Sequence, residues 1–308
     1  MTRALVLNAG SSWAAYQIGA LGWVARKKPS FDLVAGTGIG AMNGAFVACG
    51  QLEALEEFWS RIRAIDLVRP ALRQPWLGPL VGTPQRRLIA SHVSEEALES
   101  RGTTLLVSTL DLQAGEERIL EYPGSNIPIV DGLMAAVATP GGVAPYEAAG
   151  HQLGEGTLVD SFLLRNVMRR GPAEVVAIAA APPPVSAPCR YRTWRAVAER
   201  ALALNMGHDV VAALEDARIH VAVASARERA RDGLTALVDG QGLDPDEAET
   251  LRERIAAVYD GPPPTLVQAI TPSRELSYPL WSFRRRALSE AMALGRQDAR
   301  VALEEASG

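Results

Sequence analysis

Cysteine is scarce in this sequence, which has only Cys49 and Cys189 among its 308 residues. Two cysteines cannot build a disulfide scaffold, and neither lies in a metal-ligand spacing, so we expect no metal site and a reducing compartment. Long apolar runs are also lacking. The run 4–7 is too short for the core of a signal peptide, and no stretch reaches the roughly 18 apolar residues of a spanning helix. These absences predict a cytoplasmic protein without a transmembrane segment.

An excess of positive charge is missing as well. The chain carries 31 Lys and Arg against 35 Asp and Glu, a formal net charge of −4. Such a balance provides no basic field for nucleic acid, so we expect no nucleic-acid partner. The hydrophobic fraction of 48% predicts a folded chain with a sizeable core, and the length allows one large α/β domain or two small ones.

Short apolar runs alternate along the chain with residues at helical spacing. This alternation predicts a mostly parallel sheet covered by helices on both faces. Residues 70–84, which include Trp76, have a loop-like composition. The turn around 262–264 is expected to join elements of one domain, because the strand after it would otherwise lack a sheet. The expected strands are 4–7, 31–35, 104–109, 119–122, 157–159, 175–180, 219–224 and 266–270, and the expected helices include 16–24, 41–49, 52–65 and 130–139.

One turn between a predicted strand and a predicted helix has the form of a catalytic motif. Residues 36–43 read Gly-Thr-Gly-Ile-Gly-Ala-Met-Asn. The strand, sharp turn and helix match the nucleophile elbow G-x-S-x-G, which holds a serine hydroxyl above a sheet. The central residue here is Gly38, which has no side chain and cannot be a nucleophile. Glycine suits such a turn because it adopts the strained backbone without a Cβ penalty.

This segment resembles the G-T-S-x-G-A motif, followed closely by Asn, of the patatin-like phospholipase family. Residues 7–21 resemble the family's opening S-G-G-G-x-R/K-G motif and helix, and 109–116 its central strand and turn. Residues 137–140 resemble its A-S-x-x-P helix end, 158–161 its Asp-Gly-Gly/Ala motif, Asn166 a following Asn, and 281–300 its closing helix. The resemblance implies a three-layer α/β fold with a mostly parallel sheet flanked by helices. It also implies a single domain, 1–308, with a core at 1–182 and a mainly helical part at 190–308 packed on the same sheet.

The resemblance implies a Ser-Asp dyad in which the serine attacks an ester and the aspartate takes its proton. Amides of the glycine loop and a nearby cation hold the oxyanion. Asp160 is then the retained dyad aspartate and Gly38 the vacated nucleophile position. A single engineered change at position 38 would not explain the other losses, so we interpret them as natural. In the oxyanion and ligand-binding region, Ala9 and Ser11 replace glycines, Trp13 replaces the cation and Ala14 the last glycine, beside Gly10, Ser12 and Ile39.

Two classes of function follow from these residues. The first is a pseudoenzyme of lipid metabolism, without a cofactor, that binds an acyl or lipid-like ligand, an acyl carrier or a pathway protein. The second is an acyl hydrolase, thioesterase-like or acyl-transfer enzyme that uses Asp160 with water, or Ser12, in place of the elbow serine. Structural roles are open as well: Ser11 and Ser12 as helix caps, Asp160 as a turn residue, and Trp13 as core or as a lid.

Overall fold

The structure is a computed structural model that describes residues 2–72, 78–184, 186, 190–276 and 278–305, so Trp76 and Cys189 lie outside the described residues. Its centre is an eight-stranded sheet in which β10, β9, β1, β2 and β5 are parallel neighbours in that order, while β6, β7 and β8 pair antiparallel. A separate two-stranded ladder joins β3 to β4. The strands are β1 Arg3–Leu7, β2 Leu33–Thr37, β3 Arg69–Pro70, β4 Leu80–Val81, β5 Thr104–Asp111, β6 Glu116–Tyr122, β7 Tyr146–Ala148, β8 His151–Glu155, β9 Glu174–Ile178 and β10 Leu266–Ile270.

The inner strands of the parallel part, β9, β1, β2 and β5, are buried on both faces. In β1, Leu5 and Leu7 belong to one hydrophobic cluster, and Ala4 and Val6 belong to another. Successive side chains of a strand point to opposite faces, so the two clusters lie on opposite sides of the sheet. This is why the strand reads as an unbroken apolar run. The expected three-layer α/β fold is confirmed.

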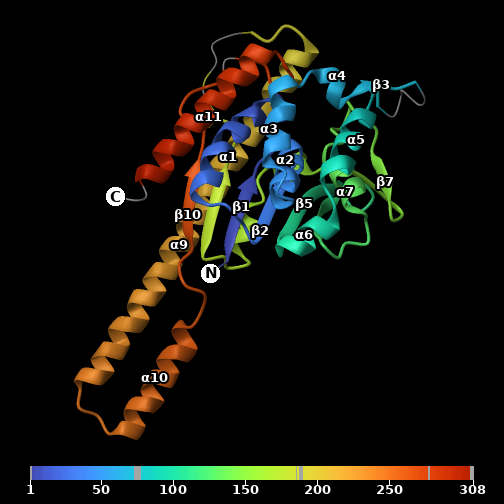
Figure 1. Cartoon of the computed structure of the whole chain (residues 1–308). Helices are drawn as coiled ribbons and strands as arrows, with labels where there is room; N and C mark the ends of the chain where they lie inside the picture. Colours follow the sequence, from blue (N-terminus) through green and yellow to red (C-terminus); the bar gives the residue numbers. More distant parts are fainter. Residues whose placement is uncertain (1, 73–77, 185, 187–189, 277, 306–308) are drawn as a thin grey trace.

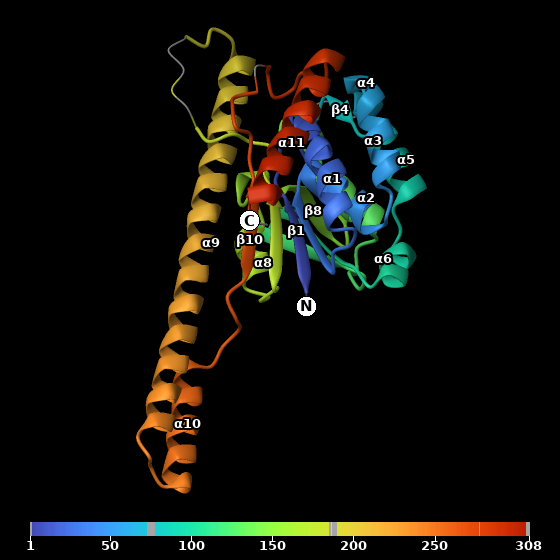
Figure 2. The same cartoon turned by 60° about the vertical axis from the view of Figure 1, so that its left-hand side comes forward.

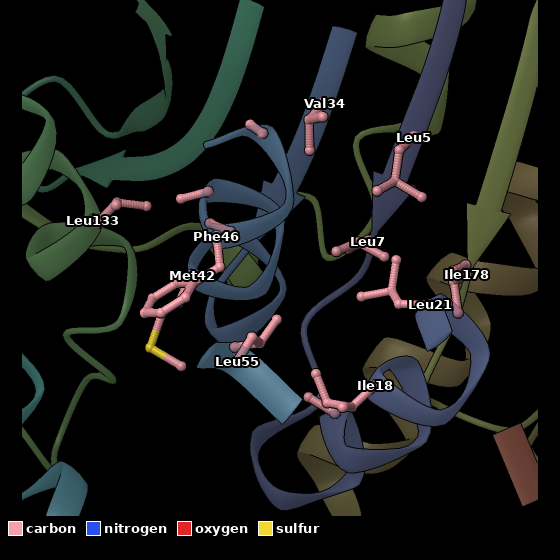
Figure 3. Close-up of a cluster of buried hydrophobic side chains, with 14 of the residues drawn as sticks. Leu5, Leu7, Ile18, Leu21, Val34, Met42, Phe46, Leu55, Leu133 and Ile178 are labelled. Carbon is pink, nitrogen blue, oxygen red and sulfur yellow. The ribbon is translucent and has the colours of Figure 1, made fainter. Parts of the chain in front are cut away.

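Helices cover both faces. One face carries α1, α2, α3 and α11 (Figure 1), and the other carries α8 and the first half of α9 (Figure 2). Side chains of all four helices of the first face belong to the larger cluster, and Figure 3 shows those of α1, α2 and α3 against the sheet. The helices are α1 Ala15–Lys27, α2 Ile39–Ala48, α3 Leu52–Arg61, α4 Ala64–Leu67, α5 Thr83–His92, α6 Glu95–Arg101, α7 Ile129–Ala136, α8 Leu164–Met168, α9 Trp194–Gly240, α10 Pro245–Tyr259 and α11 Arg285–Glu305, with 3-10 turns η1 Ser11–Ala14 and η2 Gly156–Leu158.

A helical hairpin projects from this body. Helix α9 has 47 residues and is therefore about 70 Å long, so its second half extends beyond the sheet, where α10 packs back along it (Figures 1 and 2). The chain then returns to the sheet, where β10 pairs with β9 as an edge strand. The strand expected at 266–270 thus has its sheet. Among the described residues, no helix combines the length and the apolar character that crossing a membrane requires.

Two expected strands are wrong. Residues 157–159 form the turn η2 and its end, and the strand lies earlier, in β8. Leu158 and Val159 are exposed, so their apolar character does not report burial. Residues 219–224 lie within α9, where the continuity of a long helix overrides the strand preference of Ile and Val. The helix expected at 52–65 is split into α3 and α4.

Candidate functional site

The turn between β2 and α2 has the geometry of an elbow. Gly38 has φ +57° and ψ −133°, a conformation that side-chain-bearing residues rarely adopt. Its carbonyl accepts hydrogen bonds from the Ala41 and Met42 N–H groups at 3.0 and 3.4 Å, which start the helix. Gly40 allows close approach to the first loop, since a Cβ there would lie 2.7 Å from the carbonyl oxygen of Leu7. The sequence therefore meets the steric demands of an elbow at position 38.

The space above Gly38 is filled by the carboxyl group of Glu155. A Cβ placed on Gly38 would lie 2.5 Å from Glu155 Oε1 and 3.3 Å from the Cβ of Ala9. The hydroxyl of Thr139 donates to Glu155 Oε2 at 2.5 Å, and that of Thr157 to Oε1 at 2.6 Å. Burial raises the pKa of Glu155, partly opposed by these two hydrogen bonds. The position of the nucleophile is thus occupied by the Glu155 carboxyl group, which two threonine hydroxyls hold in place.

The sheet explains why Glu155 is there. Strand β6 pairs with one edge of β5, so β2 and β8 share the other edge. On that edge the first five residues of β5 pair with β2 and the last three pair with β8. Thr37, the last residue of β2, pairs with Ser108, and Glu155, the last residue of β8, pairs with the next residue, Thr109. The two strand ends therefore meet directly beside Gly38. Nothing in the sequence indicated this meeting, because the strand was expected several residues later.

The loop expected to hold an oxyanion is used for internal contacts. The N–H of Ala9 donates to the carbonyl of Ser161 at 3.0 Å. Gly10 is packed closely, since a Cβ there would lie 2.9 Å from that of Ala180. Ser11 has φ +45°, so it adopts a conformation that glycine would take without strain. Ile39, across the elbow, is the partly buried first residue of α2. The loop therefore follows a tight path although Ala9 and Ser11 stand where the family motif has glycines.

The C-terminal part of the chain fastens this loop. The hydroxyl of Ser12 donates to the carbonyl of Leu280 at 2.7 Å, and its N–H donates to the same oxygen at 3.0 Å. The indole N–H of Trp13 donates to the carbonyl of Tyr278 at 3.0 Å, and the Tyr278 hydroxyl donates to the carbonyl of Ser12 at 3.2 Å. Neither Ser11 nor Ser12 caps a helix through its side chain, so that expectation is wrong. Trp13 is buried in the core cluster of the second face.

A buried polar network connects the loop to the elbow helix. The side chain of Gln17 donates to the carbonyl of Asn8 at 2.8 Å and accepts from the amide of Asn43 at 2.9 Å. The Oδ1 atom of Asn43 accepts from the indole N–H of Trp59 at 3.0 Å. All four residues are fully buried, where an unpaired polar group is costly, so the network fixes β1, α1, α2 and α3 relative to one another.

Asp160 contacts the end of β2 through its backbone and makes a turn contact through its side chain. Its carbonyl accepts from the Thr37 hydroxyl at 3.3 Å. Its Oδ1 accepts from the N–H of Phe162 at 2.8 Å, the turn contact expected of an aspartate after a strand. Asp160 also lines a cavity of about 270 Å³ that neither Gly38 nor Ala9 lines. Its backbone thus lies beside the end of β2, and its carboxyl group is held in a turn.

This cavity is charged. Glu117, Arg165, Asn166 and Asp209 line it together with Asp160. Burial raises the pKa of Asp160, the charge of Asp209 raises it further, and Arg165 opposes both. Burial also raises the pKa of Glu117, as does the charge of Asp160. Such walls suit polar groups better than an acyl chain.

The residues that reasoning from sequence missed are Glu155, its two threonine partners and the segment around Tyr278. In the sequence, Thr139 belongs to the segment that resembles a helix end, and Glu155 carries no signal because its role depends on where two strands stop. Among the described residues, no three His, Cys, Asp or Glu side chains are grouped to hold a metal ion.

Comparison with known proteins bears on this geometry. The family model described as Patatin-like phospholipase matches residues 5–168, which contain the elbow, the first loop, Glu155 and Asp160. The structure is also similar to that of VipD from Legionella pneumophila, with a TM-score of 0.49 and 12% sequence identity over 99% of this chain and 67% of that chain.

Proposed function

This chain belongs to the patatin-like phospholipase family, and we propose that within it the protein is a pseudoenzyme, which acts by binding and not through a serine nucleophile. The observation that carries the proposal is the Glu155 carboxyl, which lies 2.5 Å from the place of a Cβ at Gly38. A serine dyad requires a hydroxyl at this point and an open approach for an ester. Here the hydroxyl is missing and a side chain fills the approach.

Three further contacts support the proposal. The Ala9 amide already donates to Ser161, so it is not available to an oxyanion. Asp160 lines a cavity that neither Gly38 nor Ala9 lines. The hydroxyl of Ser12 is buried and donates to Leu280, which disfavours Ser12 as a displaced nucleophile. Loss of the nucleophile alone costs on the order of 10⁶ in turnover in a serine hydrolase.

We expect a fluorophosphonate probe, which reacts with activated serine hydroxyls, to leave the protein unlabelled. The reason is that no described serine is both accessible at the elbow and paired with a base. The measurement is gel fluorescence after labelling, with the Ser12→Ala variant as the matched control and a known serine hydrolase as the positive control. Labelling that disappears in Ser12→Ala would contradict the pseudoenzyme proposal.

A second candidate is hydrolysis by water that Asp160 activates. It is favoured by one observation: a carboxyl group with a raised pKa lines a polar cavity, which is a common setting for a general base. In this candidate the charged groups of the cavity bind the polar part of an ester or thioester. The acyl-transfer alternative would use the same carboxyl.

For this candidate we expect ester turnover to fall by at least about 100-fold in Asp160→Asn. Turnover should also rise with pH through the raised pKa of Asp160, because a base works only when it is deprotonated. Asp239→Asn is the matched control, since Asp239 pairs with Arg252 on the hairpin, does not line the cavity and should retain turnover. If the parent protein shows no turnover, or if Asp160→Asn turns over the ester equally fast, this second candidate is wrong and only the pseudoenzyme proposal remains.

Membership of the family makes a lipid-like ligand plausible but does not identify the ligand. We propose that the protein binds an acyl or lipid-like molecule, an acyl carrier or a protein of the same pathway, in the cytoplasm and without a cofactor. Mass spectrometry of molecules that copurify with the folded protein tests this. A fatty-acyl species would support a retained lipid site, whereas a polar metabolite would point to the charged cavity around Asp160.

A further inference from the structure

One end of the molecule is basic, although the chain as a whole is acidic. Two segments make up this basic end: residues 190–200 around the start of α9 and residues 281–290 around the start of α11. Together they contain seven arginines and two glutamates, whereas the rest of the chain has 24 Lys and Arg against 33 Asp and Glu. The positive charge is therefore concentrated, and it attracts an anionic partner that the net charge of the whole chain does not.

The two segments form one surface. The guanidinium carbon of Arg195 lies 5.8 Å from the centroid of the Trp281 ring, which joins the start of α9 to the segment before α11. In both views the first turns of α9 and α11 lie at the end of the molecule opposite the tip of the α9–α10 hairpin (Figures 1 and 2). Charges that are far apart in the sequence thus act together there.

Most of these arginines are not neutralised within the protein. The two glutamates each pair with an arginine of their own helix, Glu199 with Arg195 at 3.6 Å and Glu290 with Arg286 at 2.9 Å. Four other arginines are exposed and, within the part of the chain that the structure describes, make no ion pair. Their guanidinium groups can each donate two parallel hydrogen bonds to phosphate oxygens. They are Arg190, Arg192, Arg284 and Arg285.

An apolar anchor stands among these charges. Trp194, the first residue of α9, is 81% exposed, more than any other described Trp, Tyr or Phe, and Val197, one turn later, is 52% exposed. Tryptophan is enriched at membrane surfaces, where its ring contacts lipid and its N–H stays hydrated. Two apolar side chains do not make the core of a protein interface, which buries about 800 Å² on each partner. They suit a lipid surface, into which single side chains insert.

The basic end lies beyond the elbow along α9. The Asn205 side chain donates to the carbonyl of Thr157 at 3.4 Å, and the hydroxyl of Thr157 holds Glu155 above Gly38. Asn205 is therefore level with the elbow. Trp194 lies 11 residues earlier in the helix, about 16 Å along its axis and away from the hairpin (Figure 2). A surface bound at Trp194 would thus lie on the side of the molecule to which the elbow belongs.

We infer that the basic end binds the surface of an anionic membrane, with its arginines on lipid phosphates and Trp194 inserted at the interface. Anionic lipids attract clustered basic residues and repel acidic surfaces. The hairpin at the opposite end is acidic, since residues 218–260 contain six arginines and nine Asp or Glu, so it points away from the membrane. The inference goes beyond the pseudoenzyme proposal and does not depend on it, because neither Gly38 nor Glu155 belongs to the basic end.

Cosedimentation of the full chain with lipid vesicles tests this binding. We expect partition onto phosphatidylcholine vesicles that contain phosphatidylglycerol to be at least about tenfold stronger than onto phosphatidylcholine alone. The double variant Arg284→Glu, Arg285→Glu should weaken it at least about tenfold. Arg229→Glu with Arg254→Glu is the matched control, since it changes the net charge equally at exposed arginines of the hairpin and should bind as the parent does.

The apolar anchor has its own test. Trp194→Ala should weaken binding to the mixed vesicles about threefold or more, because the indole ring no longer inserts. Val258→Ala is the control, since Val258 is 73% exposed on α10 and should have no effect.

Three results would overturn the inference. The first is no binding of the parent to the mixed vesicles or equal binding to both kinds. The second is unchanged binding in Arg284→Glu, Arg285→Glu. The third is binding to a purified acidic acyl carrier protein, lost in that double variant, without binding to vesicles, which would assign the basic end to a protein partner.

Discussion

The Gly38→Ser variant is expected to be less stable than the parent by about 2 to 4 kcal/mol. Two costs add. Serine at φ +57° and ψ −133° strains the backbone, and its Cβ would lie 2.5 Å from Glu155 Oε1. Thr139 and Thr157 hold that carboxyl, so it does not swing away freely. Chemical denaturation monitored by circular dichroism measures the loss, and a variant as stable as the parent would contradict the elbow geometry.

Two further variants separate the two costs. Gly102→Ser is the control for a positive φ without a clash, since Gly102 has φ +62° and ψ +30°, in the left-handed helical region, and its Cβ would meet nothing within 4 Å; it should cost about 1 to 2 kcal/mol. In a Glu155→Ala background, the penalty of Gly38→Ser should shrink, whereas that of Gly102→Ser should not. Equal Gly38→Ser penalties in both backgrounds would show that the carboxyl does not press on position 38.

Much of the fold could be predicted because local sequence decides it. The strand 266–270 and the start of β1 are read from short apolar runs, and the elbow from the glycines around Gly38. These features depend on neighbouring residues, and the structure has them at the expected places. The long α9 was harder, because Ile219 and Val223 favour strands in isolation and become helical only as part of a 47-residue helix.

The occupant of the elbow could not be predicted, because it depends on tertiary register. Glu155 reaches Gly38 because β2 and β8 end at adjacent residues of β5. Thr37 at the end of β2 pairs with Ser108, and Glu155 at the end of β8 pairs with Thr109. Likewise, Ser12 meets Leu280 across 268 residues of chain. The sequence alone shows that a nucleophile is missing at position 38, but only the fold shows which side chain stands in its place.

The second large effect is expected where α1 and α11 cross. Gly19→Ala and Gly295→Ala should each cost about 3 kcal/mol, because the added methyl group overlaps backbone of the facing helix. A Cβ on Gly19 would lie 2.8 Å from the Cα of Met292, and one on Gly295 would lie 2.9 Å from the carbonyl carbon of Tyr16. Backbone atoms of a packed helix cannot rotate out of the way as a flexible side chain does. Denaturant titration measures the loss of unfolding free energy.

Gly233→Ala is the matched control, with an effect of opposite sign. Gly233 lies in α9 with nothing within 4 Å of its Cβ position, so alanine should stabilise the helix by about 0.5 to 1 kcal/mol. The crossing also matters for the loop, since α1 follows Ser12 and α11 follows Leu280. Separation of the helices in Gly295→Ala should therefore speed hydrogen exchange of the Ser12 amide, which donates to Leu280. An unchanged stability in Gly19→Ala and Gly295→Ala would mean that the two helices do not approach this closely.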